Sequence, residues 1–279
     1  MVAMSVVKEF ALVHDANPRF RASMEDSHCC ITSFRGNDSE ALFAVFDGHG
    51  GKDAADQLAD KFPKVFENKR ASVSDLNQHS SFDMWFQTYQ DLDKALDPKL
   101  MAFQGAAAVA AYVVGREDGS KVVYASNVGD ARAVLAHGGK VDRVTRDHKA
   151  SEKSEIDRIT ELGGFVIASR VQGILSVSRA LGDHGLKPYV SIEPYATENI
   201  IPLAELQQET PVILIVACDG LWDVFNDNEA ISIVQSKLGE LKKEGKPLKE
   251  QVYRAAEHLM HSALQNGSTD NISIIVALL

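Results

Sequence analysis

Three stretches of the chain are apolar almost without interruption, and each has an aspartate at one end. They are residues 41–46 (ALFAVF) before Asp47, residues 212–218 (VILIVAC) before Asp219, and residues 272–279 (ISIIVALL) after Asp270. Short apolar runs bounded by Gly and Asp are typical of β-strands that are buried on both faces. The pattern therefore predicts three core strands, each with a carboxylate at one end.

Shorter segments rich in β-branched and apolar residues, bounded by turn residues, predict the other strands. They are residues 9–13, 27–34, 106–114, 121–126, 131–137 and 190–198. Apolar residues at helical spacing predict helices over 52–66, 82–96, 151–162, 226–238 and 247–264. We expect Ser151 to cap one helix, and Asn226 with Glu229 to form a capping box on another. Residues 165–180 read as extended at first and then as a loop.

The strands come in clusters joined by short turns, with long helices between the clusters. This arrangement predicts an α+β fold, in which two antiparallel β-sheets pack as a sandwich flanked by α-helices (αββα). No linker or shift in composition marks a boundary, so we expect residues 1–279 to form a single domain. The segment of roughly 148–187 is richer in Gly and charge, and is predicted to be a small flap on this body.

Composition narrows the classes of partner. The net charge of −10 argues against a nucleic-acid-binding protein, which needs a basic face. No apolar run approaches the roughly 18–20 residues that span a bilayer, so we expect no membrane association. The three cysteines are odd in number and two are adjacent (Cys29, Cys30 and Cys218), which favours packing roles over disulfides or a soft-metal site. A reducing compartment follows, namely the cytoplasm, with the nucleus as a second option.

The predicted strand directions bring several carboxylates together. If the last strand runs antiparallel to the other two core strands, Asp47, Asp219 and Asp270 meet at one edge. Glu25 and Asp26 directly precede the strand that forms a hairpin with residues 41–46, so they reach the same end. So many carboxylates cannot all stay ionised without a cation. Hard divalent ions with oxygen ligands, Mg²⁺ or Mn²⁺, are the expected partners.

Two such ions about 3.5–4 Å apart would activate a water and stabilise a phosphoryl group during in-line displacement. The carbonyl of Gly48 is a further oxygen ligand, because glycine has no side chain to block its approach. An arginine can clamp the phosphate oxygens, but Arg19 and Arg21 share one face of an extended segment and the pattern does not choose between them. His49 is a candidate proton donor to the leaving oxygen.

Six motifs carry a resemblance to a known family. They are RASMED at 21–26, FDGHGG at 46–51, NVGDAR at 127–132, LSVSRALGD at 175–183, ACDGLWD at 217–223 and GSTDNI at 267–272. In this order they resemble the motif series of the metal-dependent type 2C serine/threonine protein phosphatases, and they cover nearly the whole chain. The resemblance implies a single catalytic domain that hydrolyses phosphoserine and phosphothreonine in proteins, by direct attack of metal-activated water.

The resemblance also implies roles for individual residues. They are Arg21 for phosphate binding, His49 as general acid, Asp47, the Gly48 carbonyl, Asp219 and Asp270 as direct ligands of two Mg²⁺ or Mn²⁺ ions, Glu25 and Asp26 as ligands through water, Asp130 with Asp219 for a third and weaker ion, and Asn271 as a supporting neighbour. The expected partners are phosphorylated proteins, and the expected state is a monomer. Asp130 alone is equally well explained as part of a Gly-Asp hairpin turn.

One motif departs from the family pattern, and two other functions stay open. The family usually shows Gly-Ser-Thr-Ala where this chain has GAAA at 105–108, so hydroxyls are missing at Ala106 and Ala107. A non-catalytic scaffold with a phosphatase fold would have lost a metal carboxylate, and none of the expected ones is substituted. A hydrolase of small phosphate esters, or a nuclease, is the other alternative; the lack of a basic stripe argues against nucleic acid.

Overall fold

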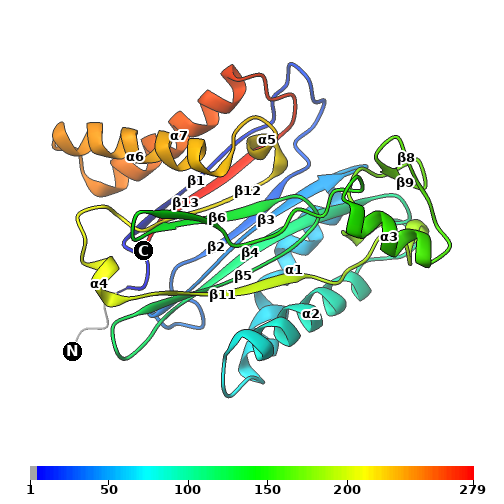
Figure 1. Ribbon diagram of the computed structural model, residues 1–279, viewed down its shortest axis with the longest axis horizontal. Helices are drawn as coiled ribbons and strands as arrows, with labels where there is room; N and C mark the ends of the chain where they lie inside the picture. Colours follow the sequence, from blue (N-terminus) through cyan, green and yellow to red (C-terminus); the bar gives the residue numbers. More distant parts are fainter. Residues whose placement is uncertain (1–4) are drawn as a thin grey trace.

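The computed structural model describes residues 5–279. Two antiparallel β-sheets pack face to face, with helices on both outer sides (Figure 1). The first sheet has the strand order β1-β13-β12-β6-β7. Its strands are β1 (Glu9–Asp15), β6 (Arg132–His137), β7 (Lys140–Arg143), β12 (Ile213–Ala217) and β13 (Ile272–Leu278).

The second sheet has the order β11-β5-β4-β3-β2, and a short strand, β10, also pairs with β4. Its strands are β2 (Ser27–Ile31), β3 (Glu40–His49), β4 (Gly105–Gly115), β5 (Lys121–Val128), β10 (Leu181–Gly182) and β11 (Tyr195–Ile201). The predicted fold class, an α+β sandwich of two antiparallel sheets flanked by helices, is thereby confirmed.

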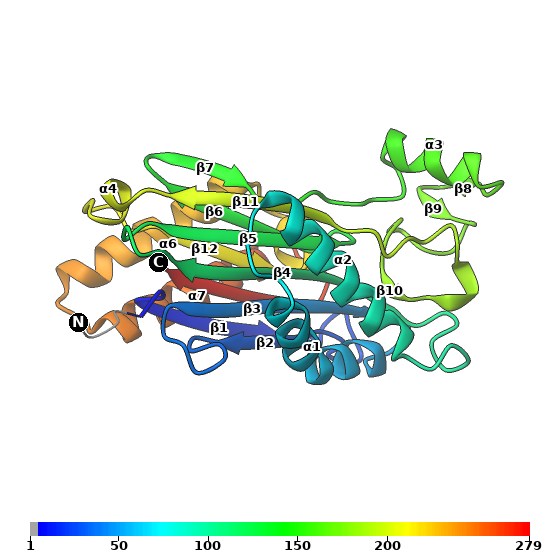
Figure 2. The same ribbon diagram turned by 90° about the horizontal axis from the view of Figure 1, so that it is seen from below.

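Two pairs of long helices cover the outer faces (Figures 1 and 2). The second sheet is covered by α1 (Asp53–Ala71) and α2 (Gln78–Lys94), and the first by α6 (Asp227–Lys243) and α7 (Leu248–Gln265). The shorter helices are α3 (Lys153–Glu161), α4 (Leu203–Leu206), α5 (Asp219–Trp222) and a 3₁₀ turn at His184–Leu186. Within residues 5–279, no helix combines the length and the apolar character needed to cross a bilayer.

Strand β3 illustrates why the core strands are apolar at every position. Leu42 and Phe46 face the helices, where the Phe46 ring packs edge-on against Phe62 with centroids 5.4 Å apart. Phe43 and Val45 point the other way, into the layer between the two sheets. A strand with apolar neighbours on both sides buries all its side chains, as the uninterrupted run predicts.

The strand register fixes which chain ends meet. β2 pairs with β3 so that Ser27 lies opposite Phe46, and β12 pairs with β13 so that Ala217 lies opposite Ile274, both antiparallel. The residues just before β2, at the end of β3, just after β12 and just before β13 therefore lie at one end of the sandwich. The two sheets are joined there by the amide of Asp219, which donates to Oδ2 of Asp47 at 3.4 Å.

The segment predicted as a flap lies beyond this end of the strands (Figure 2). It contains α3 and the two-residue strands β8 (Val166–Ile167) and β9 (Arg170–Val171). The segment has a small apolar core of its own, in which Ile159, Val171 and Ala180 are fully buried.

Several predicted boundaries were wrong. β3 continues through Asp47 to His49, because these residues still pair with residues 105–107 of β4. β2 ends at Ile31, and not at residue 34. The prediction missed β7, and residues 165–180 hold only two short strands, since Ala168 and Ser169 adopt positive φ between them.

The predicted helix starts had mixed outcomes. The capping box of Asn226 and Glu229 is confirmed, with Glu229 N donating to Asn226 Oδ1 at 3.0 Å. Ser151 does not cap α3; Glu152 precedes the helix and makes no capping bond with its side chain. α2 begins four residues earlier than predicted, because Asn77 caps it.

Candidate metal centre

Three aspartates from three different elements meet at the shared end of the sandwich. Asp47 comes from β3, Asp130 from the turn between β5 and β6, and Asp219 from the first position of α5. Each offers an oxygen atom, and these atoms lie within 4.8 Å of one another. Asp47 also belongs to a second group at the same spacing, with Asp26 and the sulfur of Cys218. Asp47 is thus the residue that the two groups share.

The electrostatics of these carboxylates call for a cation. Burial raises the pKa of Asp47 and of Asp219 well above the ordinary value, and neighbouring carboxylates raise both further. Burial raises the pKa of Asp26 to about 6, and its Oδ2 is a buried atom without a hydrogen-bond partner. A set of crowded oxygen donors, one of them unpaired, matches the preferences of Mg²⁺ and Mn²⁺. The residues present therefore fit a divalent metal.

Asn271 ties the N-terminal segment to the last strand. Its Oδ1 accepts a hydrogen bond from the amide of Glu25 at 2.9 Å, and its Nδ2 donates to the carbonyls of Ala16 at 2.7 Å and Ser23 at 3.0 Å. One side chain thus satisfies three backbone groups of a segment that has no regular structure. This fixes residues 16–25 over the site, although they lie far from Asn271 in sequence.

Arg21 and Asp270 face each other. The Arg21 guanidinium pairs with the Asp270 carboxylate, and its Nε donates to the carbonyl of Thr269 at 3.3 Å. Burial raises the pKa of Asp270, and the charge of Arg21 opposes that rise. Asp270 is therefore turned toward Arg21 and stands outside the two close groups around Asp47. Arg19 instead lies over the ring of Phe20, at 5.3 Å, so Arg21 is the arginine that reaches the carboxylates.

His49 is held by a residue that the sequence did not single out for a role. Its Nε2 lies 2.7 Å from Oδ2 of Asp183, whose side chain is only 1% exposed. Asp183 adopts a left-handed conformation with φ of 50°, and the preceding amide, of Gly182, donates to Asp93 at 2.7 Å. Its place at the end of the LSVSRALGD motif was the available signal. Because Nε2 is engaged, Nδ1 is the ring nitrogen left for other contacts.

Gly48 has a different reason to be glycine than the sequence suggested. A Cβ on Gly48 would lie 2.3 Å from the carbonyl oxygen of Glu25, so it is the chain's own backbone that approaches closely. The Glu25 carboxylate accepts hydrogen bonds from the amide of Gly51 at 3.1 Å and from the hydroxyl of Ser23 at 3.0 Å. Gly48 therefore allows the RASMED segment to pack against the end of β3.

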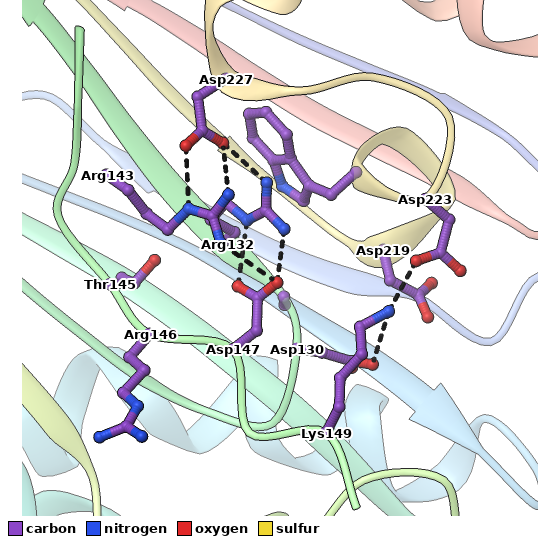
Figure 3. A network of polar contacts seen from close by, with 12 residues as sticks. Asp130, Arg132, Arg143, Thr145, Arg146, Asp147, Lys149, Asp219, Asp223 and Asp227 are labelled. Carbon is purple, nitrogen blue, oxygen red and sulfur yellow. Dashed lines mark hydrogen bonds and ion pairs between the residues drawn. The ribbon is translucent and has the colours of Figure 1, made fainter. Parts of the chain in front are cut away.

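Two further charged residues complete one corner of the centre, and neither was predicted. Nζ of Lys149 lies 2.7 Å from Oδ1 of Asp223 and 3.8 Å from Oδ2 of Asp130 (Figure 3). Asp223 stands one helical turn after Asp219, and its amide donates to the Asp219 carbonyl at 2.8 Å. Asp219 and Asp223 are four residues apart in DGLWD, and residues at that spacing lie on one face of a helix. The proximity of Asp223 to the centre would therefore have been predicted if residues 219–222 had been predicted as a helical turn.

The alanines that depart from the family pattern lie directly beside the centre. β4 pairs with β3 so that Ala107 is opposite Asp47 and Ala106 is opposite Gly48. Both alanines are buried. The strand next to Asp47 thus offers no side-chain hydroxyl at these two positions.

The predicted packing of the cysteines is confirmed. Cys29 joins the core on the helix side of the second sheet, and Cys30 packs toward the layer between the sheets, so adjacent strand residues do point to opposite faces. All three cysteines are free thiols. Cys218 is fully buried behind the acidic centre.

A two-sheet sandwich with an acidic centre at one end is the arrangement expected of the metal-dependent phosphoprotein phosphatases. The model of the family "Protein phosphatase 2C" matches residues 10–272, which is nearly the whole chain. The chain therefore belongs to the protein phosphatase 2C family, and it is a serine/threonine phosphoprotein phosphatase.

Relatives of known description support this family membership, and solved structures support the fold. "Protein phosphatase 2C homolog 1" of Schizosaccharomyces pombe is 36% identical over 266 residues, covering 95% of this chain and 71% of the relative. The protein of that description in Saccharomyces cerevisiae is 30% identical over 280 residues, covering 96% and 92%. A serine-threonine phosphatase 2C from Toxoplasma gondii superimposes with a TM-score of 0.76 at 22% identity, covering 96% and 94%. A sex-determining protein of C. elegans gives a TM-score of 0.81 at 24% identity, covering 96% and 64%, which speaks for the fold.

Proposed function

We propose that this phosphatase works with two Mg²⁺ or Mn²⁺ ions, and that Asp47, which belongs to both close groups, would help to hold them. Asp219, Asp270 and the carbonyl of Gly48 are the other direct ligands in this proposal. The convergence of Asp47, Asp130 and Asp219 within 4.8 Å is the observation that carries it, because three crowded carboxylates repel one another unless a cation lies between them. In this proposal Glu25 and Asp26 act through water, Asn271 supports them, and Asp130 with Asp219 serves a third, weaker ion.

The ions, when bound, supply a water of lowered pKa as nucleophile and neutralise the charge that develops on the phosphoryl group. The chain's own residues bind and orient the substrate. Arg21 clamps the phosphate oxygens after leaving Asp270, and that exchange is cheap because a half-exposed ion pair contributes little. His49, held through Nε2 by Asp183, donates a proton from Nδ1 to the leaving oxygen.

We further propose a single catalytic domain, with residues 148–187 as a flap beside the site, that acts as a monomer on phosphorylated proteins. The separate apolar core of the flap segment supports the proposal that it packs as a distinct part of the domain. We place the enzyme in the cytoplasm, with the nucleus as a second option; the three free thiols favour such a reducing compartment.

The test is hydrolysis of a phosphoserine or phosphothreonine peptide with and without added Mn²⁺ or Mg²⁺, followed by a chelator. We expect activity to depend on the metal and to disappear on chelation. Asp219→Asn should remove activity while the protein stays folded, since the amide cannot replace a charged ligand. Asp157→Asn is the matched control, because it removes the same charge from an exposed position on α3.

Three outcomes would contradict the proposal. They are activity that survives the chelator, turnover by Asp219→Asn close to that of the wild type, and faster hydrolysis of nucleotides or single-stranded DNA than of phosphopeptides. The first two would remove the metal mechanism, and the third would favour the small-ester hydrolase or nuclease alternative.

A further inference from the structure

Lys149 places a positive charge inside an otherwise acidic centre. Its ammonium lies between Asp223 at 2.7 Å and Asp130 at 3.8 Å, with the Asp219 side chain beside it (Figure 3). Asp130 is 5% exposed, and burial raises its pKa to about 6 although Lys149 opposes the rise. The ammonium therefore neutralises part of a corner that a cation would otherwise have to fill.

The neighbouring arginines are not available for this task. Arg132 and Arg143 both bind Asp227, at 2.7 Å and 2.9 Å, in a network that also includes Asp147 (Figure 3). Within residues 5–279, Lys149 is the cation that pairs with Asp130. If Lys149 lost its charge, this corner would carry more uncompensated negative charge.

The backbone of Lys149 is fixed where the chain passes from the sandwich into the flap. Lys149 forms an isolated β-bridge with Val177, and the next amide, of Ala150, donates to the Ser176 carbonyl at 2.7 Å. On the other side, the amide of His148 donates to the Gly129 carbonyl at 2.9 Å. The ammonium thus stays within reach of the corner even when its side chain moves away.

We propose that Lys149 is a tethered cation that holds the corner formed by Asp130, Asp219 and Asp223, and that it sets the affinity of the third metal ion by competing for the carboxylate of Asp130. This inference rests on the proposed function, because it concerns the weak ion of the same centre. Two positive charges about 4 Å apart repel each other, so a divalent ion would bind at Asp130 only after the Lys149 ammonium has moved away from it. A tethered competitor keeps a constant effective concentration, which makes the third ion intrinsically weak.

The test counts bound Mn²⁺ directly, from the electron paramagnetic resonance signal of the free ion during a titration, without any substrate. We expect Lys149→Met to tighten the weakest class of sites by about tenfold, because a divalent charge no longer meets an ammonium about 4 Å away. Lys149→Arg keeps the charge and should stay close to the wild type. Asp130→Asn, in the wild type and in Lys149→Met, should abolish that weakest class and so identify it as this corner.

Lys153→Met is the matched control, since it removes the same charge from an 88% exposed side chain that pairs with Asp157. It should leave every Mn²⁺ affinity unchanged. Thermal unfolding checks that each variant is folded, and Lys149→Gln replaces Lys149→Met if the latter is not. A weakest-site affinity of the neutral variant that is unchanged within about twofold, or lower, overturns the proposal, as does tightening by Lys149→Arg. Failure of the wild type to hydrolyse phosphopeptides would contradict the proposed function instead, because ion counting needs no turnover.

Discussion

The bond between His49 and Asp183 allows a sharp test of how the leaving group is protonated. Asp183→Asn keeps the shape of the side chain and tolerates the left-handed backbone at φ of 50°, so it removes mainly a charge. A hydrogen bond to a charged group contributes about 1.5–3 kcal/mol, and a neutral one about 0.5–1.5 kcal/mol. The substitution should therefore cost about 1–1.5 kcal/mol in the positioning of His49, or roughly tenfold in rate.

That loss should depend on the leaving group. A serine alkoxide needs a proton as it departs, whereas p-nitrophenolate leaves readily without one. We expect Asp183→Asn to reduce kcat for a phosphoserine peptide about tenfold, and kcat for p-nitrophenyl phosphate by less than about twofold. His49→Gln should show the same substrate dependence with a larger loss, and the double variant should lose little more than His49→Gln alone, because the two residues act as a unit.

Asp93→Asn is the control for a purely structural effect. Asp93 accepts a hydrogen bond from Gly182 and so supports the same loop, but it does not touch His49. It should change both substrates equally. Equal losses on both substrates in Asp183→Asn, or additive losses in the double variant with His49→Gln, would refute the idea that Asp183 positions His49.

Three other substitutions test separate parts of the structure. Gly48→Ala should weaken Mn²⁺ binding while the fold survives, since its Cβ would meet the Glu25 carbonyl at 2.3 Å; unaltered ion titrations would contradict this. Asn271→Ala should cost about 2–3 kcal/mol in urea unfolding and raise KM, because it leaves three backbone groups without partners; an unchanged midpoint would argue against it. Burial lowers the pKa of His148 from 6.5 to about 3, so its contribution is fully present above pH 6.5 and is lost as the pH falls toward 3. Between pH 7.5 and 5.5 the wild type should lose about 1.4 kcal/mol more than His148→Gln, and equal losses in urea unfolding would exclude this buried histidine as the cause.

The periodicity of the chain predicted the architecture well, and the limits of that reading lie at the site. Residues 41–46 predicted a strand buried on both faces, but the apolar rule ended it at Phe46. The strand continues to His49, because β4 opposite it supplies Gly105 and Ala106, which let the polar residues pair at the mouth of the sandwich. The hydropathy pattern of one strand contains no information about the strand that pairs with it. The end of β3 was therefore predicted too early.

At the site, the positions of the carboxylates were predicted, whereas several of their contacts were not. The carboxylates were found because strand directions brought Asp47, Asp219 and Asp270 to one end, which is a statement about topology. The contacts of Asp270 were not found, since its pairing with Arg21 depends on where a long side chain turns. Neither was Asp183, which meets His49 across a separation of 134 residues.

By itself, the sequence determined the two-sheet sandwich, the end at which its acidic residues gather, and the need for a divalent cation. These follow from periodicity and charge, which neighbouring positions along the chain already contain. The family resemblance already favoured Arg21 over Arg19, which the residue pattern alone left open. Only the tertiary structure decided that Asp183 holds His49 and that Lys149 lies among the carboxylates. The physical reason is range: a hydrogen bond or an ion pair acts over a few ångströms, and its partners here come from segments that meet only after both sheets have packed.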